Sequence, residues 1–347
     1  MKQLAIFLLA MLLPTQLWSQ PRKLSTVAEI ATYNGPDREQ VLYAGAKGEG
    51  KIVWYTSLAG DSYKAIARAF EAKYPGVRLE TYRAGGSELV PRMVEEAKAR
   101  RPICDSLETT EDSLMVSKVN QLLRPYFSPH LEKYPDEVKE KADKALVFWT
   151  NIRESYLGFG YNKSQFSPGA ALKGFDGLLH PELKGRIGIT LNESSAKMIG
   201  AMIKIKGEGF VKKLKGQEIR AYTVSSAALV DMIASGEIGA SFHIFRNHAL
   251  VSAAKGSSVA WLPMELVPTN SGAVALAAQP AHPHAALLFI DFLLNDAVKI
   301  FDKFQYGHPT VDHGFKRWYQ DRGRSLAELE TESAKWEKLA KEITQRY

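Results

Sequence analysis

The stretch KIVWYTSLAGDSYKAIARAFEAKYPGV, residues 51–77, decides the fold class of this protein. Its first five residues form an apolar run that is typical of a buried strand. A polar turn follows, in which Asp61 or Ser62 is suited to cap a helix. Apolar side chains then recur at helical spacing until Pro75 and Gly76 end the pattern: Ala65, Ile66, Ala69, Phe70 and Tyr74. The stretch therefore predicts a strand followed by an amphipathic helix.

Strand and helix patterns alternate through the rest of the chain. VRLETY and ICDSLETT are typical of strands and flank a helical pattern in AGGSELVPRMVEEAKARR. A second α/β series begins at YLGFGYNK, residues 156–163, and leads to one long apolar helix over residues 282–304. From Ser325 an amphipathic stripe predicts a last helix that packs against the body of the protein. The order of elements indicates an α/β fold with a parallel or mixed sheet covered by helices.

The composition is that of a globular protein with room for two cores. The 347 residues carry 45 Lys and Arg against 38 Asp and Glu, a formal net charge of +7, and 45% of them are hydrophobic. This modest positive charge favours anionic solutes weakly, and no Lys/Arg-rich block indicates a nucleic-acid partner. The single cysteine, Cys104, excludes an intramolecular disulfide and is predicted to be a buried structural thiol.

The N-terminus has the pattern of a cleaved secretory signal. Lys2 precedes an apolar run from Leu4 to Leu13, which is too short for a stable membrane anchor. We expect residues 1–19 to be a signal peptide, although a hydrophobic N-terminal helix of the fold is the alternative. The signal predicts a periplasmic protein.

Polar residues follow the strands throughout the chain. In open α/β sheets, ligands bind beyond the carboxyl ends of the strands, where helix N-termini offer free N–H groups. Each such loop by itself is also an ordinary helix cap. Taken together, the loops predict a ring of solute-binding residues contributed by both halves of the chain: Thr56, Ser57, Gly86, Ser87, Glu108, Thr109, Glu193, Ser194 and Ser226.

The sequence gives little support for an enzyme, because it lacks common catalytic motifs. The sequence contains no G-x-S-x-G, H-E-x-x-H or P-loop motif. We therefore expect no catalytic residues and no cofactor. A periplasmic hydrolase that uses Glu108 or His248 as a base remains the alternative.

Several segments resemble a known family. GSELVPRMVEEAKARRPICDSLETTE, ALVDMIASGEIGAS and VAWLPMELVPTNSGAVALAAQPAHPHAALLFIDFLL are similar to the extracellular solute-binding proteins of ABC importers, in the branch described as ferric-iron binding. The resemblance spans about Lys51 to Thr310. It implies a two-lobed class II periplasmic-binding fold that closes on a ligand in the cleft between the lobes, with residues 24–151 plus 263–310 in lobe 1 and 152–262 plus 311–347 in lobe 2.

The same resemblance implies the partners. The protein would act as a monomer that closes by hinge motion on a small-molecule or ion ligand. It would then deliver that ligand to an ABC transporter permease in the inner membrane. A sensing module that presents its closed state to a signalling receptor is a further alternative.

One departure from the family pattern bears on the ligand. Ferric-iron binders of this branch carry tyrosines where this chain reads SFHIFRNHAL, with Phe245 and Arg246 at the place of the pair and His248 after them. Arginine repels a cation but can clamp a carboxylate or phosphate, so we expect a small polar or anionic solute. Bound iron stays possible as a transported ligand, through an oxygen and nitrogen site drawn from a wider set: Glu108, Glu111, Glu193, His243 and His248.

Overall fold

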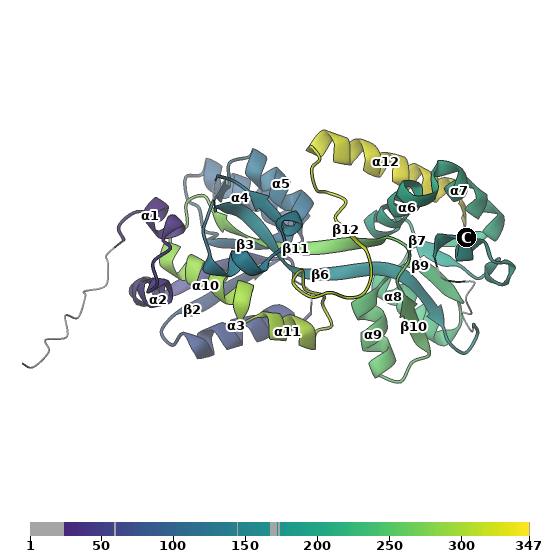
Figure 1. The fold of residues 1–347 in the computed structure, drawn as a ribbon, viewed down its shortest axis with the longest axis horizontal. Helices are drawn as coiled ribbons and strands as arrows, with labels where there is room; N and C mark the ends of the chain where they lie inside the picture. Colours follow the sequence, from purple (N-terminus) through teal and green to yellow (C-terminus); the bar gives the residue numbers. More distant parts are fainter. Residues whose placement is uncertain (1–23, 59, 144, 167–171, 173, 347) are drawn as a thin grey trace, which may run out of the picture.

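The computed structural model describes residues 24–346 except 59, 144, 167–171 and 173. The protein has two lobes that lie side by side and are joined by two long strands, β6 (Val147–Asn162) and β11 (Val267–Ala277) (Figure 1). These strands pair antiparallel with each other, so that one mixed sheet continues from one lobe into the other. The expected signal peptide at residues 1–19 lies outside the described residues. None of the described helices is long and apolar enough to cross a membrane.

The sheet of the first lobe begins with the strand of the opening stretch. β1 (Lys51–Thr56) pairs in parallel with β2 (Arg78–Arg83) and with β3 (Ser106–Thr110), and β11 pairs antiparallel with β3. The helices that follow these three strands are α3 (Ser62–Lys73), α4 (Gly86–Lys98) and α5 (Glu111–Val119). Parallel strands end at the same edge of a sheet. The three helices therefore all start at the edge that faces the second lobe (Figure 1).

Smaller elements complete the first lobe. They are α1 (Val27–Thr32), α2 (Arg38–Glu49), β4 (Leu123–Arg124), β5 (Lys139–Lys141) and 3-10 turns at Pro129–Lys133 and Asp136–Val138. The free thiol of Cys104 is buried and donates to the carbonyl of Ser106, as expected of a structural cysteine.

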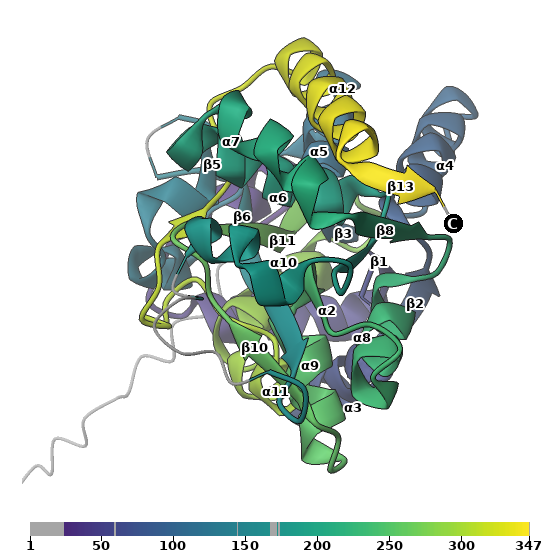
Figure 2. The same cartoon turned by 90° about the vertical axis from the view of Figure 1, so that its right-hand side faces the viewer.

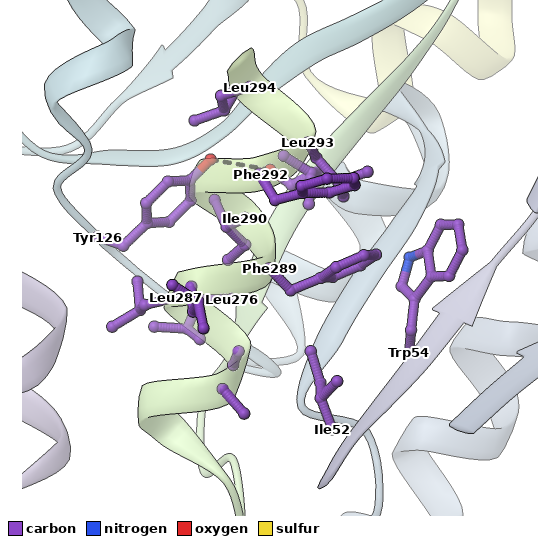
Figure 3. Packing of buried hydrophobic residues seen from close by; sticks show 14 of the residues in the cluster. Ile52, Trp54, Tyr126, Leu276, Leu287, Phe289, Ile290, Phe292, Leu293 and Leu294 are labelled. Atoms are coloured by element: carbon purple, nitrogen blue, oxygen red, sulfur yellow. Dashed lines mark hydrogen bonds between the residues drawn. The ribbon is translucent and has the colours of Figure 1, made fainter. Parts of the chain in front are cut away.

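The largest core of the first lobe forms around α10 (Pro283–Asn295). Every residue of α10 from Ala285 to Leu294 is buried, and Phe289 lies edge-on to Trp54 of β1 with ring centroids 5.0 Å apart (Figure 3). Phe70 of α3 contacts Phe289 at a similar distance. The helix pattern read in the opening stretch thus buries its apolar face against a segment more than 200 residues away.

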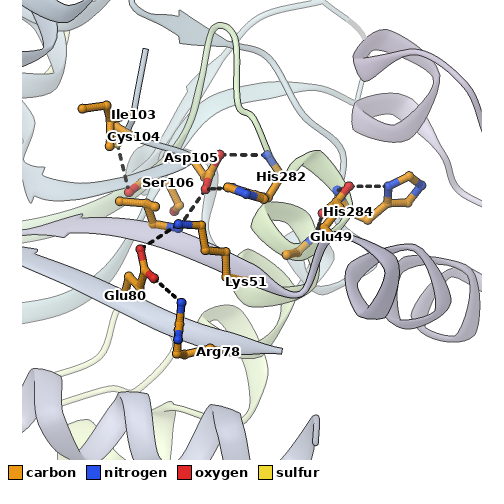
Figure 4. Close-up of polar contacts among 12 residues, drawn as sticks. Glu49, Lys51, Arg78, Glu80, Ile103, Cys104, Asp105, Ser106, His282 and His284 are labelled. Atoms are coloured by element: carbon orange, nitrogen blue, oxygen red, sulfur yellow. Dashed lines mark hydrogen bonds and ion pairs between the residues drawn. The ribbon is translucent and has the colours of Figure 1, made fainter. Parts of the chain in front are cut away.

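Two carboxylates, one buried and one part-buried, hold the start of α10. Asp105 accepts hydrogen bonds from the backbone N–H and from Nδ1 of His282, at 2.9 and 2.7 Å, and from the N–H of Val53 at 2.7 Å (Figure 4). Glu49 accepts in the same way from His284. Both carboxylates lie at a helix N-terminus, where negative charge is favourable.

The prediction of a single long helix over residues 282–304 is wrong. The chain forms α10 and then a separate short helix, α11 (Val298–Lys303). The amides of Asp296 and Ala297 both bond to the carbonyl of Phe292, which ends the regular ladder, and the Asp296 carboxylate pairs with Lys73. The apolar pattern alone did not reveal this break because it continues on both sides of the turn.

The second lobe has its own core and helices. Its strands are β7 (Gly188–Thr190), β8 (Ile219–Tyr222), β9 (Ala240–Phe245) and β10 (Val259–Leu262). Its helices are α6 (Glu193–Lys206), α7 (Glu208–Lys213), α8 (Ser226–Ser235) and α9 (Arg246–Ala254), with 3-10 turns at Phe175–Leu179, Pro181–Leu183 and Leu214–Gln217. β9 and β10 pair with the far half of β6, so the crossing strand is part of both lobes.

The C-terminal segment, residues 317–346, contacts both lobes. β12 (Arg317–Trp318) pairs with β11, and Tyr319 packs into the core of the first lobe. α12 (Leu326–Glu342) then packs on α6, and β13 (Thr344–Arg346) pairs with β8 (Figure 2). The last helix expected from Ser325 is confirmed, and the Ser325 hydroxyl caps it.

Candidate functional site

The strand ends of the first lobe bring four polar side chains together. Arg153 of β6 donates from Nε to Oε1 of Glu108 at 2.9 Å and from Nη2 to the hydroxyl of Ser57 at 3.3 Å. The other carboxylate oxygen of Glu108 accepts from the Thr56 hydroxyl at 2.6 Å and from the Ser57 amide at 3.1 Å. We call these four residues the hinge cluster, because Arg153 lies on a strand that connects the lobes.

The hinge cluster is almost closed to solvent. Thr56 and Glu108 have no exposed surface, Arg153 is 6% exposed, and its guanidinium lies 5.5 Å from the ring centre of Tyr306. Glu108 therefore neutralises a buried arginine and has both of its oxygens occupied. Sequence reasoning missed Arg153, although the adjacent charges of Arg153 and Glu154 inside an otherwise uncharged strand were a signal that could have found it.

Gly86 and Thr109 form a second contact of the expected ring. A Cβ placed on Gly86 would lie 2.9 Å from Oγ1 of Thr109 and 2.1 Å from Oγ of Ser113. Thr109 has no exposed surface, and its hydroxyl has no hydrogen-bond partner among the described residues. Gly86 thus allows α4 to pack closely on α5. Because it has no side chain, the hydroxyls of Thr109 and Ser113 lie directly against its backbone.

A cavity of about 610 Å³ lies between the lobes, lined by α4, α5, α6 and the C-terminal segment. We call it the α12 cavity, because Leu326, Leu329 and Trp336 of α12 form one wall. It brings together three residues of the expected ring, Gly86, Ser87 and Glu193.

Lys197 is a residue of this cavity that sequence reasoning missed. Its ammonium contacts the carboxylate of Glu193, one helical turn earlier on α6, and its side chain is 9% exposed. Burial opposes the charge, but Glu193, Asp321 and Asp112 outweigh it and hold the pKa of Lys197 above its usual value. The pKa of Glu193 is lowered in turn, chiefly by Lys197. An i, i+4 spacing of Glu and Lys in NESSAK was the available signal.

The helix starts of the second lobe form a separate hollow of about 500 Å³, lined by residues 190–192 and 221–225. Asn192 caps α6 and donates from Nδ2 to the hydroxyls of Thr190 and Ser226, at 2.8 and 3.3 Å. Ser194 is half-buried in the first turn of α6. Asn192 thus links Ser226 of α8 to the start of α6, where Ser194 lies, and both serines belong to capped helix starts.

Arg246 and His248 lie in the first turn of α9, a helix that the sequence analysis did not predict. β9 ends at Phe245, directly before this helix, and the Phe245 ring packs against His248 with centroids 5.4 Å apart. Burial lowers the pKa of His248. Burial lowers the pKa of His313, and the nearby positive charge of Arg246 lowers it further.

The wider metal set does not assemble. Among the described residues, no group of three or more His, Cys, Asp or Glu side chains is placed to hold a metal ion. Glu108 is occupied by Arg153, and His243 is fully buried with Nε2 accepting from the amide of Thr190. Burial lowers the pKa of His243 to about 3, so that it is neutral.

Glu154 links the C-terminal segment to the crossing strand. It has no exposed surface and accepts from the hydroxyls of Tyr156 and Tyr319, at 2.6 and 2.7 Å, and from Nη1 of Arg317 at 3.0 Å. β6, which joins the lobes, is therefore held by two buried carboxylates: Glu108, through Arg153, and Glu154.

Comparisons with known proteins agree with this architecture. Residues 53–306 match the model of the bacterial extracellular solute-binding protein family. An uncharacterized protein of Haemophilus influenzae is 24% identical over 261 residues, which are 72% of this chain and 74% of that protein.

Solved structures with the same fold include FutA (IdiA) of Trichodesmium in complex with iron and citrate, at 20% identity and a TM-score of 0.66. They also include AfuA of Actinobacillus pleuropneumoniae with bound fructose 6-phosphate, at 21% identity and a TM-score of 0.65. The matches cover 85% and 84% of this chain and 99% of each neighbour. The two-lobed fold and the family match over most of the chain establish that this protein belongs to the bacterial extracellular solute-binding proteins.

Proposed function

We propose that this protein captures a small anionic solute in the periplasm and delivers it, as a monomer, to the permease of an ABC importer in the inner membrane. Family membership supports a binding protein rather than a hydrolase. The proposed lobes are residues 24–151 plus 263–310 and residues 152–262 plus 311–347. They would close by bending β6 and β11, since these are long strands shared by both lobes.

The main support for an anionic ligand comes from the residues at the start of α9. Phe245 and Arg246 stand where the resemblance to ferric-iron binders implies a tyrosine pair. Arg246 belongs to the second lobe, and Arg153 reaches the facing edge of the first lobe. In this proposal a carboxylate or phosphate binds Arg246, Ser57, Ser194, Ser226 and the free helix amides beside them. Glu108 and Thr56 would hold Arg153 in place rather than touch the solute.

Two kinds of cargo fit this arrangement. One solved neighbour binds iron with citrate, and another binds fructose 6-phosphate. Both ligands present carboxylates or a phosphate that an arginine can clamp, so an iron complex with an anion is compatible with the proposal. Iron without such an anion is not, because phenolate ligands are lacking at positions 245 and 246.

Calorimetric titration of the purified protein with citrate, ferric citrate and fructose 6-phosphate tests the proposal. We expect one of these anions to bind and to raise the melting temperature. Arg246→Ala should weaken that binding at least ten-fold, whereas Arg68→Ala, at an exposed site on α3, should not. Unchanged binding by Arg246→Ala, or no binding of any of the three, would contradict the anion clamp. Loss of uptake on deletion of the gene would separate transport from a sensing role.

A further inference from the structure

The α12 cavity carries a charge opposite to that of the proposed anion site. Five acidic residues and one lysine line it: Glu95, Asp112, Glu193, Asp321, Glu330 and Lys197. Three of these carboxylates surround Lys197 closely enough to raise its pKa: Glu193, Asp321 and Asp112. One ammonium thus faces three carboxylates, and an excess of negative charge is left in a partly dehydrated space.

Two polar atoms at or directly behind the cavity wall, Oδ1 of Asp112 and the hydroxyl of Thr109, lack a hydrogen-bond partner among the described residues. Oδ1 of Asp112 is buried and accepts no hydrogen bond from any described residue. The hydroxyl of Thr109, a fully buried residue, is also unpaired and faces Gly86 in the cavity wall. A buried carboxylate oxygen without a donor is costly, and a positively charged group bound beside Asp112 would lower that cost.

The remaining wall of the cavity is apolar. Val90, Pro91 and Val94 of α4 and Val116 of α5 face Leu326, Leu329 and Trp336 of α12. A volume of about 610 Å³ is in the range of small-molecule sites, which combine a mostly apolar lining with a few placed polar groups. The cavity therefore suits an organic ligand better than a bare ion, and no set of metal ligands is assembled among the described residues.

We propose that the α12 cavity is a second binding site, for a small organic amine whose ammonium pairs with Asp112 and whose apolar part packs against α4 and α12. A primary ammonium supplies both the positive charge and the N–H donors that Asp112 lacks. An anion is disfavoured there by the surrounding carboxylates. This site goes beyond the proposed function, because the transported anion would bind Arg246 and not Asp112.

Three probes of one shape test the chemistry. 2-Phenylethylammonium, 2-phenylethanol and phenylacetate differ mainly in the charge of the polar end. In calorimetric titrations of the full purified protein, we expect the ammonium to bind at least ten-fold more tightly than the alcohol and the acetate to bind most weakly. Phenylacetate binding as tightly as the ammonium, or no binding of the ammonium at millimolar concentration, would overturn the proposal.

Variants locate the binding. Asp112→Asn keeps the shape of the side chain and should lower the affinity for 2-phenylethylammonium at least ten-fold. Glu330→Gln, at the α12 side of the cavity, should lower it several-fold without touching the fold of α5. The matched control is Asp136→Asn, whose carboxylate is 70% exposed and pairs with Lys139 and Lys141. If both cavity variants bind the amine as the wild type does, the site is elsewhere and the proposal fails.

The same variants separate this proposal from the anion proposal. Arg246→Ala should lose the anion and keep the amine, and Asp112→Asn should do the reverse. Loss of both ligands in Asp112→Asn, with an unchanged melting temperature, would contradict two separate sites.

Discussion

Arg153 of β6 and Glu108 of β3 form a buried ion pair, with Nε and Oε1 2.9 Å apart, at the point where the connecting strand leaves the first lobe. The two residues are 45 positions apart in the chain and meet only because β11 lies between their strands and presents Gly272 to both. A side chain at Gly272 would overlap both groups. The pair therefore couples the strand ends of the first lobe to the connection between the lobes.

Removal of one partner of this pair should destabilise the protein strongly. Arg153→Met would leave the buried Glu108 carboxylate without its counter-charge, which typically costs roughly 3–5 kcal/mol of the free energy of unfolding. Arg78→Met removes a surface partner of Glu80 and should cost less than about 1 kcal/mol. Urea denaturation of both variants measures the difference. Equal effects of the two substitutions would show that the buried pair has no special role.

Stability should fall as pH rises through the titration of Glu111. Burial raises the pKa of Glu111 to about 7, and Arg322 only partly offsets this effect. The folded state thus keeps a proton that the unfolded state releases near its ordinary pKa of 4.5, so the contribution is complete below pH 4.5 and lost by about pH 7. Glu111→Gln should flatten this part of the curve of unfolding free energy against pH. Exposed Glu137→Gln should leave the slope as it is. A slope unchanged in Glu111→Gln contradicts this assignment.

The C-terminal segment should loosen without Arg322. The guanidinium of Arg322 lies 3.2 Å from Glu111 and 3.1 Å from Glu140, both in the first lobe, while α12 packs on the second. We expect Arg322→Ala to speed amide hydrogen exchange across residues 317–325. Arg324→Ala is the control, because Arg324 pairs with Glu332 inside the same segment. Exchange that is the same in Arg322→Ala and in the wild type would mean that the ion pairs do not hold the segment to the first lobe.

The core around α10 should be sensitive to a cavity. Phe289 is fully buried between Trp54 and Phe70, and Phe289→Ala should lower the free energy of unfolding by roughly 3–5 kcal/mol. Val119→Ala, at a residue that is 69% exposed, should change it by less than about 0.5 kcal/mol. Denaturant midpoints give both values. A loss below about 1 kcal/mol in Phe289→Ala would mean that the core collapses into the space.

The sequence by itself determined the alternation of strands and helices, the helix starts at Ser62 and Leu326, and the α/β class, whereas the two lobes were expected only from the resemblance to a known family. These features depend on periodicity and on capping residues, which act within a few positions along the chain. The same local signals predicted polar residues at the strand ends, although not which of them meet.

Only the tertiary structure decided the contacts of the candidate site. Glu108 became the partner of Arg153 instead of an open ligand, and Lys197 entered a cavity with Asp112 and Asp321. The break between α10 and α11 and the helical start at Arg246 also escaped the pattern. The physical reason is that the partner of a buried charge is set by strand register and by helix packing between distant segments. No local window of the sequence contains that information.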